Sequence, residues 1–178
     1  MTGGTDSKQV LILTFDTRTG AIDIKKAAQN MLSMRSNHRL VACKGYFYAL
    51  GGLSKGEQLK SCERIRNTNL ETGQWEQVRS MAVPRRDFAC LTVFSNERIL
   101  VFGQAGSSDN VAELYCPDSN SWQIVKLGGL NIPTDATSFA SLSLPLTEFA
   151  ASERYLIFAT RPQRQTEVYE LEGHRVKQ

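Results

Sequence analysis

Residues 45–52 read Gly-Tyr-Phe-Tyr-Ala-Leu-Gly-Gly, and this apolar run with two glycines behind it decides the fold. Residues 97–104, Glu-Arg-Ile-Leu-Val-Phe-Gly-Gln, repeat the pattern, and residues 153–160, Glu-Arg-Tyr-Leu-Ile-Phe-Ala-Thr, repeat it more weakly. Short runs of aromatic and β-branched residues are typical of strands. A glycine directly behind a strand lets the chain bend and another backbone approach closely. We therefore expect a strand that ends in a bend at each of these three places.

A second segment recurs between the copies of the first. Its copies begin at residues 15, 68, 115 and 169, which is 53, 47 and 54 residues apart. They are Phe15–Ile22, Thr68–Trp75, Tyr115–Trp122 and Tyr169–Val176. Each has Gly or Asn near its centre, as a tight turn between two strands requires. A period near 50 residues with four strands in each unit is typical of a propeller blade.

Apolar runs broken by turn residues make up the rest of the chain, and they favour an all-β fold. Only residues 24–34 are compatible with a turn or two of helix. We expect residues 1–9 to be disordered and residues 10–178 to form about three four-stranded blades behind an N-terminal half blade. The expected blades span roughly residues 27–78, 79–125 and 126–178.

The composition is that of one folded domain of ordinary size, or of a piece of a larger one. Of the 178 residues, 41% are hydrophobic and 22% are charged, which indicates a folded core rather than disorder. The net charge of +3 is too mild to suggest nucleic acid. The apolar runs are shorter than the roughly 18 residues of a membrane span, and the N-terminus does not resemble a secretory signal. We therefore expect a cytoplasmic protein that binds neither nucleic acid nor membrane.

The repeat resembles the kelch family, whose pattern is a basic residue before the first strand, Gly-Gly after the second, and an aromatic residue seven positions before a Trp. The first full repeat supplies these positions as Arg35, Gly51, Gly52, Thr68 and Trp75. The second supplies them as Arg85, Gly103, Gln104, Tyr115 and Trp122. The third keeps only Tyr169, with Val176 in place of Trp. The resemblance covers about residues 10–178 and implies a kelch-type β-propeller segment.

The two tryptophans suit the outer strands of such blades. A large side chain there wedges against the neighbouring blade and buries on the order of 150–250 Å². We therefore expect Trp75 and Trp122 to be buried core residues.

The sequence lacks the residue patterns that form the catalytic and metal sites of known propeller enzymes. The two histidines, His38 and His174, lack the acidic residues and spacing of a metal or nucleophile site. Four cysteines stand singly, which favours reduced thiols over a zinc site; they are Cys43, Cys62, Cys90 and Cys116. We therefore expect no enzyme, no catalytic residues, no metal and no cofactor.

The loops on one face of the blades carry an excess of basic residues. In an antiparallel blade, the loop before the first strand and the loop between the second and third open on the same face. Arginine on such loops suits an acidic peptide or protein surface. The candidate partner-binding residues are Arg35, Lys55, Gln58, Lys60, Arg85, Arg86, Ser107, Asp109, Arg161 and Arg164.

These observations favour a protein–protein interaction module or scaffold. The alternatives are a structural subunit of a larger assembly and a carbohydrate-binding or carbohydrate-active propeller. Closed propellers usually have four to eight blades, and a stack of three exposes apolar blade faces. We therefore expect a longer parent chain or a second copy, as in a homodimer, to complete the ring.

Overall fold

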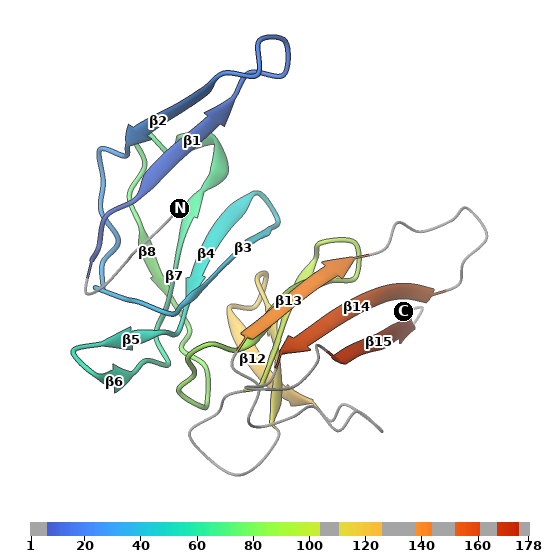
Figure 1. Ribbon diagram of the computed structural model, residues 1–178. Helices are drawn as coiled ribbons and strands as arrows, with labels where there is room; N and C mark the ends of the chain where they lie inside the picture. The colour runs from blue at the N-terminus through green and yellow to red at the C-terminus, as the bar shows by residue number, and fades with distance from the viewer. Residues whose placement is uncertain (1–6, 104–110, 126–137, 144–151, 161–166, 175–178) are drawn as a thin grey trace.

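The computed structural model describes residues 7–103 and 111–125 in full, and residues 138–143, 152–160 and 167–174 as backbone strands. In this described part the chain forms antiparallel strands and one short 3-10 helix, without an α-helix. The prediction of an all-β fold is confirmed. Figure 1 shows the sheets following one another from an N-terminal hairpin, at the upper left, to the last sheet at the right.

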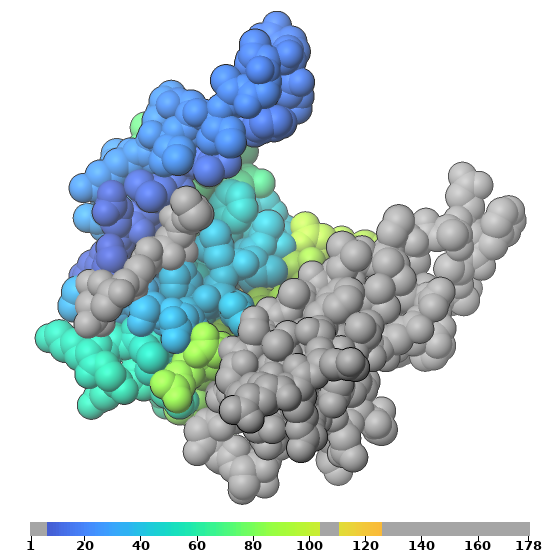
Figure 2. Space-filling model, in the orientation of Figure 1, coloured from blue at the N-terminus to red at the C-terminus, as the bar shows by residue number. Residues whose placement is uncertain are grey.

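The N-terminal hairpin pairs β1 (Leu11–Phe15) with β2 (Ile22–Lys26). Its turn starts at Asp16, whose carboxylate Oδ1 accepts a hydrogen bond of 2.8 Å from the backbone N–H of Arg18. The hairpin, dark blue in Figure 2, projects from the sheet beside it. It forms the predicted N-terminal half blade.

Blade 1 and blade 2 are the two four-stranded sheets. Blade 1 contains β3 (Arg39–Cys43), β4 (Tyr46–Leu50), β7 (Cys62–Arg66) and β8 (Glu76–Val78), paired in that order. Blade 2 contains β9 (Ala89–Val93), β10 (Arg98–Phe102), β11 (Ala112–Cys116) and β12 (Ser121–Val125), also paired in chain order. A small hairpin of β5 (Leu53–Ser54) and β6 (Glu57–Gln58) interrupts the loop between β4 and β7.

A third sheet pairs β13 (Ser138–Ser143), β14 (Ser152–Thr160) and β15 (Glu167–His174) in chain order. Within the described residues it has three strands, where the sequence predicted four. The first strands of successive sheets are neighbours, because β3 contacts β9 and β9 contacts β13. Since each sheet also runs outward from its first strand, the first strands lie along a shared inner side. This is the arrangement of blades in a propeller.

The helical turns expected in residues 24–34 do not form. β2 runs to Lys26, and the backbone N–H groups of Ala27 and Met31 then donate to the carbonyl oxygens of Val10 and Lys8, both at 2.9 Å. Because these donors bond to the chain before β1, they are not available for the bonds within a helix. The segment is an extended strap.

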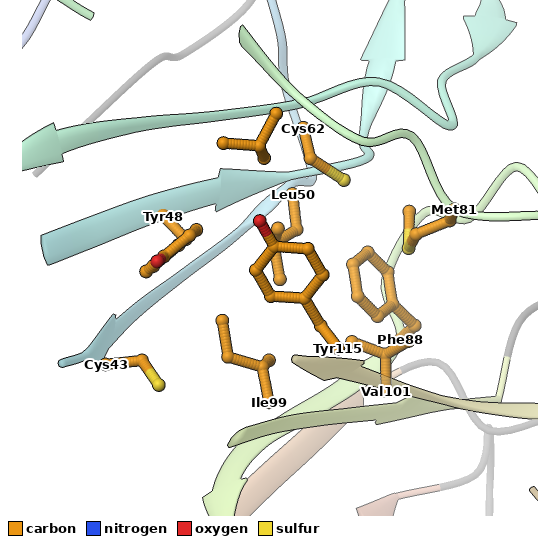
Figure 3. Packing of buried hydrophobic residues seen from close by; sticks show 10 residues of the cluster. Cys43, Tyr48, Leu50, Cys62, Met81, Phe88, Ile99, Val101 and Tyr115 are labelled. Atoms are coloured by element: carbon orange, nitrogen blue, oxygen red, sulfur yellow. The ribbon is translucent and has the colours of Figure 1, made fainter. Parts of the chain in front are cut away.

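The main core lies between blades 1 and 2 (Figure 3). The ring of Tyr115 lies between Tyr48 and Phe88, and the Tyr48 and Tyr115 ring centroids are 5.7 Å apart in an edge-on arrangement. All three side chains are buried, as are Ile99 and Val101 beside them. The two blades therefore pack face to face as one unit.

A second core joins the N-terminal hairpin to blade 1. Its buried members are Val10, Ala27, Met31, Ala49, Ile65 and Trp75. Trp75 is 5% exposed, so the prediction that it is a core residue holds. Trp122 is only half-buried, at the edge of the main core. The prediction that Trp122 is a core residue therefore holds only in part: it packs against the main core, but it is not fully buried.

Blade 1 has a short insertion that blade 2 lacks. Because of it, equal spacing from the tryptophans does not identify equivalent residues in the two blades. Glu63 and Glu113 occupy the same place in β7 and β11, since each pairs with the arginine before its blade. Counting two residues on, the position equivalent to Tyr115 is Ile65 and not Thr68. The extra residues of blade 1 form the 3-10 helix η1 (Asn67–Asn69) behind β7. Ile65 is accordingly buried beside Trp75.

Gly52 sits where the two blades approach each other. Its φ of +98° lies in the left-handed region, and a Cβ there would lie 2.4 Å from the carbonyl oxygen of Ser36 and 2.8 Å from the Cβ of His38. Its N–H donates to the carbonyl oxygen of Arg85 at 2.8 Å. The predicted bend with a close backbone approach is therefore present at this glycine.

Candidate functional site

The candidate surface is made by the β5–β6 hairpin of blade 1 and the β8–β9 connection between the blades. Backbone hydrogen bonds hold these two segments together: Arg85 N–H donates to Leu59 O at 3.1 Å, and Met81 N–H to Lys60 O at 3.0 Å. Asn37 joins the same surface, because its carbonyl oxygen accepts a bond from Asp87 N–H at 3.1 Å. Loops from both blades thus form one continuous surface.

Arg35, a predicted partner-binding residue, is fully buried. Its guanidinium lies against Glu63, with Nη2 at 2.7 Å and Nε at 3.0 Å from Oε1. Nη1 donates to the carbonyl oxygens of Gly51 at 2.7 Å and Ser61 at 3.1 Å. The Glu63 carboxylate also accepts the backbone N–H of Leu32 at 2.5 Å. The pair ties the loop before β3 to the ends of β4 and β7.

Arg85 repeats this arrangement in blade 2. It is fully buried, and Nη2 and Nε lie 3.1 and 3.3 Å from Oε1 of Glu113. Nη1 donates to Gly103 O at 2.8 Å, and Glu113 accepts the backbone N–H of Ala82 at 2.6 Å. Burial without full compensation lowers the pKa of Arg85.

The prediction that Arg35 and Arg85 contact a partner is therefore wrong. The guanidinium N–H groups of both side chains donate to residues within the fold, and neither side chain reaches solvent. A sequence signal for this role exists, because each arginine is followed 28 residues later by a glutamate, Glu63 or Glu113. A charge repeated with its counter-charge at the same spacing indicates an internal pair.

Three other predicted residues remain on the surface. Lys55 is exposed in the tight turn between β5 and β6, where its φ is +50°. Lys60 is exposed beside the β8–β9 connection, and Arg86 is exposed within it. Gln58 is half-buried, and its side-chain oxygen has no hydrogen-bond partner among the described residues. The remaining four predictions lie outside the described residues; they are Ser107, Asp109, Arg161 and Arg164.

Burial sets the protonation of several groups near this surface. Desolvation, with the nearby charges of Arg35 and Arg39, lowers the pKa of His38 to about 4, so its imidazole is neutral at neutral pH. Burial raises the pKa of Cys43 to about 11 and that of Cys62 to about 12. Hydrogen bonds from Ser119 lower the pKa of Cys116. All four cysteines are free thiols.

The described part of the chain holds no group of three or more His, Cys, Asp and Glu residues that could bind a metal ion. In the same residues no helix has the length and apolar character needed to cross a membrane.

Comparison with known proteins adds one finding. Residues 34–82 match the family model of the kelch motif. No curated protein matches the chain. The matched residues run from the loop that carries Arg35, through all of blade 1, to the start of the β8–β9 connection. The resemblance to the kelch-repeat family is thereby confirmed: residues 34–82 carry a kelch motif, and the sheets around them are antiparallel blades.

Proposed function

We propose that this chain is a non-catalytic protein-interaction module that holds an acidic segment of a partner against the joined loops of blades 1 and 2. The kelch motif supports a protein-interaction module in general. The observation that carries the acidic partner is the exposure of Lys55, Lys60 and Arg86 on one continuous surface.

The charges of Lys60 and Arg86 on this surface are available to a ligand. In the described residues, the side chains of Lys60 and Arg86 take part in no salt bridge, whereas the buried arginines are fully engaged. Exposed cations on rigid loops steer an acidic partner and select against a basic one. The buried Arg35 and Arg85 pairs hold those loops in place.

A peptide array with acidic, neutral and basic sequences tests this proposal. We expect the chain to bind acidic peptides, and added salt to weaken that binding because exposed charges are screened. The variant K55E/K60E/R86E should lose binding. The matched control R18E/K25E, which changes exposed residues of the N-terminal hairpin, should keep it. Equal binding of acidic and neutral peptides would overturn the proposal.

We propose as a second function that the chain is a structural subunit, because the N-terminal hairpin has an exposed apolar face. Leu13 pairs with Ile24 and Phe15 with Ile22 across the hairpin, and these side chains are 48–61% exposed. Clustered apolar side chains of this kind mark contact surfaces. A second copy of this chain is the proposed occupant.

Sedimentation at low micromolar concentration tests the second function. A dimer that the F15S/I22S variant converts to a folded monomer supports it, and a wild-type monomer contradicts it. The carbohydrate-binding alternative stays a prediction. The four free thiols support a reducing compartment such as the cytoplasm as the proposed location.

A further inference from the structure

A groove of about 1020 Å³ lies between the outer parts of blades 1 and 2. Residues 77–82, from β8 into the β8–β9 connection, line one part of it, and residues 119–122, from the β11–β12 turn, line another. Lys60 completes the lining. The groove thus adjoins the basic loop surface and shares Lys60 with it.

Hydrogen bonds between its two sides make this groove a preformed site. The indole Nε1 of Trp122 donates to the carbonyl oxygen of Arg79 at 2.7 Å, and the backbone N–H of Arg79 donates to Oδ1 of Asn120 at 2.8 Å. The same Oδ1 accepts the hydroxyl of Tyr115 at 2.8 Å. Because Tyr115 is a buried core residue, the groove is anchored to the main core.

The groove combines an aromatic surface with positive charge. The Trp122 ring packs on Tyr115 with centroids 4.9 Å apart, and the side chain is only half-buried. Lys60 and Arg79 are exposed, and the lining contains neither aspartate nor glutamate. Within the described residues no carboxylate forms a salt bridge with either cation. Uncharged hydroxyl and amide side chains supply the other polar groups; they come from Gln77, Ser80, Ser119, Asn120 and Ser121.

We propose that this groove binds an acidic peptide segment of a partner protein, with its carboxylates at Lys60 and Arg79 and an apolar side chain against Trp122. Guanidinium and ammonium groups bind carboxylates through charge-assisted hydrogen bonds, and a fixed tryptophan is a favoured anchor surface at interfaces. The inference rests on the proposed function and gives it a location: the groove extends the loop surface from Lys60 to Arg79.

The two tryptophans provide both the signal and its control: Trp122 lies in the groove, and Trp75 is buried away from it. In a ¹⁵N–¹H correlation spectrum the two indole N–H groups give two signals, which the single-tryptophan variants W75F and W122F assign. The probe is a short capped peptide of Asp, Glu and Leu residues. Its matched control contains Asn and Gln in place of the acids. We expect the acidic peptide to shift the Trp122 signal and to leave the signal of buried Trp75 in place.

Charge variants then locate the carboxylates. K60Q and R79Q should each weaken peptide binding by about five-fold or more, while K25Q on the N-terminal hairpin should leave it unchanged. Arg79 anchors the groove through its backbone, so R79Q is expected to fold. An unchanged Trp75 signal checks folding in every variant.

The possible results separate the groove from the function as a whole. The acidic peptide could bind without moving the Trp122 signal, and its binding could depend only on Lys55 and Arg86. In that case the proposal that the groove is the binding site is wrong, and the proposed function stands. If no acidic peptide binds, both are wrong. If the neutral peptide binds equally well, or if inorganic phosphate displaces the acidic peptide at the same concentration, the groove does not recognise an acidic peptide.

Discussion

Blades 1 and 2 carry the same internal scaffold, but they place their tryptophans in different surroundings. Each blade has a buried arginine–glutamate pair, a glycine carbonyl that accepts from the arginine, and a buried methionine at the start of the preceding loop. In blade 1 these are Arg35, Glu63, Gly51 and Met31, and in blade 2 they are Arg85, Glu113, Gly103 and Met81. The repeated residues therefore build the same strand connections twice.

The tryptophans diverge because their neighbours differ. The N-terminal hairpin and its strap cover Trp75, whose Nε1 has no hydrogen-bond partner among the described residues. Trp122 is half-buried, and its Nε1 donates a hydrogen bond to the carbonyl oxygen of Arg79. A motif position thus fixes the strand that a residue occupies, while the next element in space decides whether that residue serves the core or a surface.

The largest expected effect comes from breaking the shared scaffold. E63Q or E113Q leaves a buried guanidinium without its counter-charge, so each should lower the free energy of unfolding by about 3–5 kcal/mol. The control is the pair of half-buried Arg64 and exposed Glu76, and E76Q should cost less than about 1 kcal/mol. Urea denaturation followed by circular dichroism measures all three. Similar small losses in every variant would show that the buried pairs do not hold the blades.

The bend behind β4 is expected to give the next largest effect on stability. Gly52 and Gly56 both have positive φ, +98° and +84°, but only at Gly52 would a Cβ meet backbone, whereas nothing lies within 4 Å at Gly56. We expect G52A to destabilise the chain by about 2 kcal/mol more than G56A does. Equal losses would mean that backbone strain alone, and not the close approach of the segment before β3, requires the glycine. Thermal unfolding of the two variants measures the difference.

These features differ in how far the sequence could predict them. The all-β fold, the bend at Gly52 and the burial of Trp75 follow from strand patterns and turn chemistry within short windows. The burial of Arg35 and Arg85 does not, because it depends on glutamates far along the chain that fold back against them. An exposed loop arginine and an internally paired one look the same until that long-range partner is considered.

The groove could not be predicted from the sequence for a similar reason. It forms only where the β8–β9 connection meets the β11–β12 turn, and its lining residues are unremarkable within their own segments. The equivalence of Ile65 with Tyr115 was hidden by the insertion that forms η1. Sequence spacing alone assigned Thr68 to that position, because it cannot tell where in a loop the extra residues belong.

A smaller effect distinguishes the residues that immediately precede the first strands of the two blades. His38 and Phe88 occupy equivalent positions, and the pKa of His38 is lowered from 6.5 to about 4. Between these values the unfolded chain binds a proton that the folded chain does not, so stability falls as pH drops from 6.5 to 4. Above pH 6.5 His38 contributes no pH dependence. H38F, which copies blade 2, should flatten this slope in denaturation at a series of pH values. An unchanged slope would assign it to other groups.

The most direct test of the difference between the blades is acrylamide quenching of the single-tryptophan variants. W75F retains only Trp122, and W122F retains only Trp75. We predict that acrylamide quenches the fluorescence of W75F clearly more strongly than that of W122F, because Trp75 is 5% exposed and Trp122 is half-buried. Equal quenching of the two folded variants, or stronger quenching of W122F, would contradict the account of one tryptophan in the core and one at a surface.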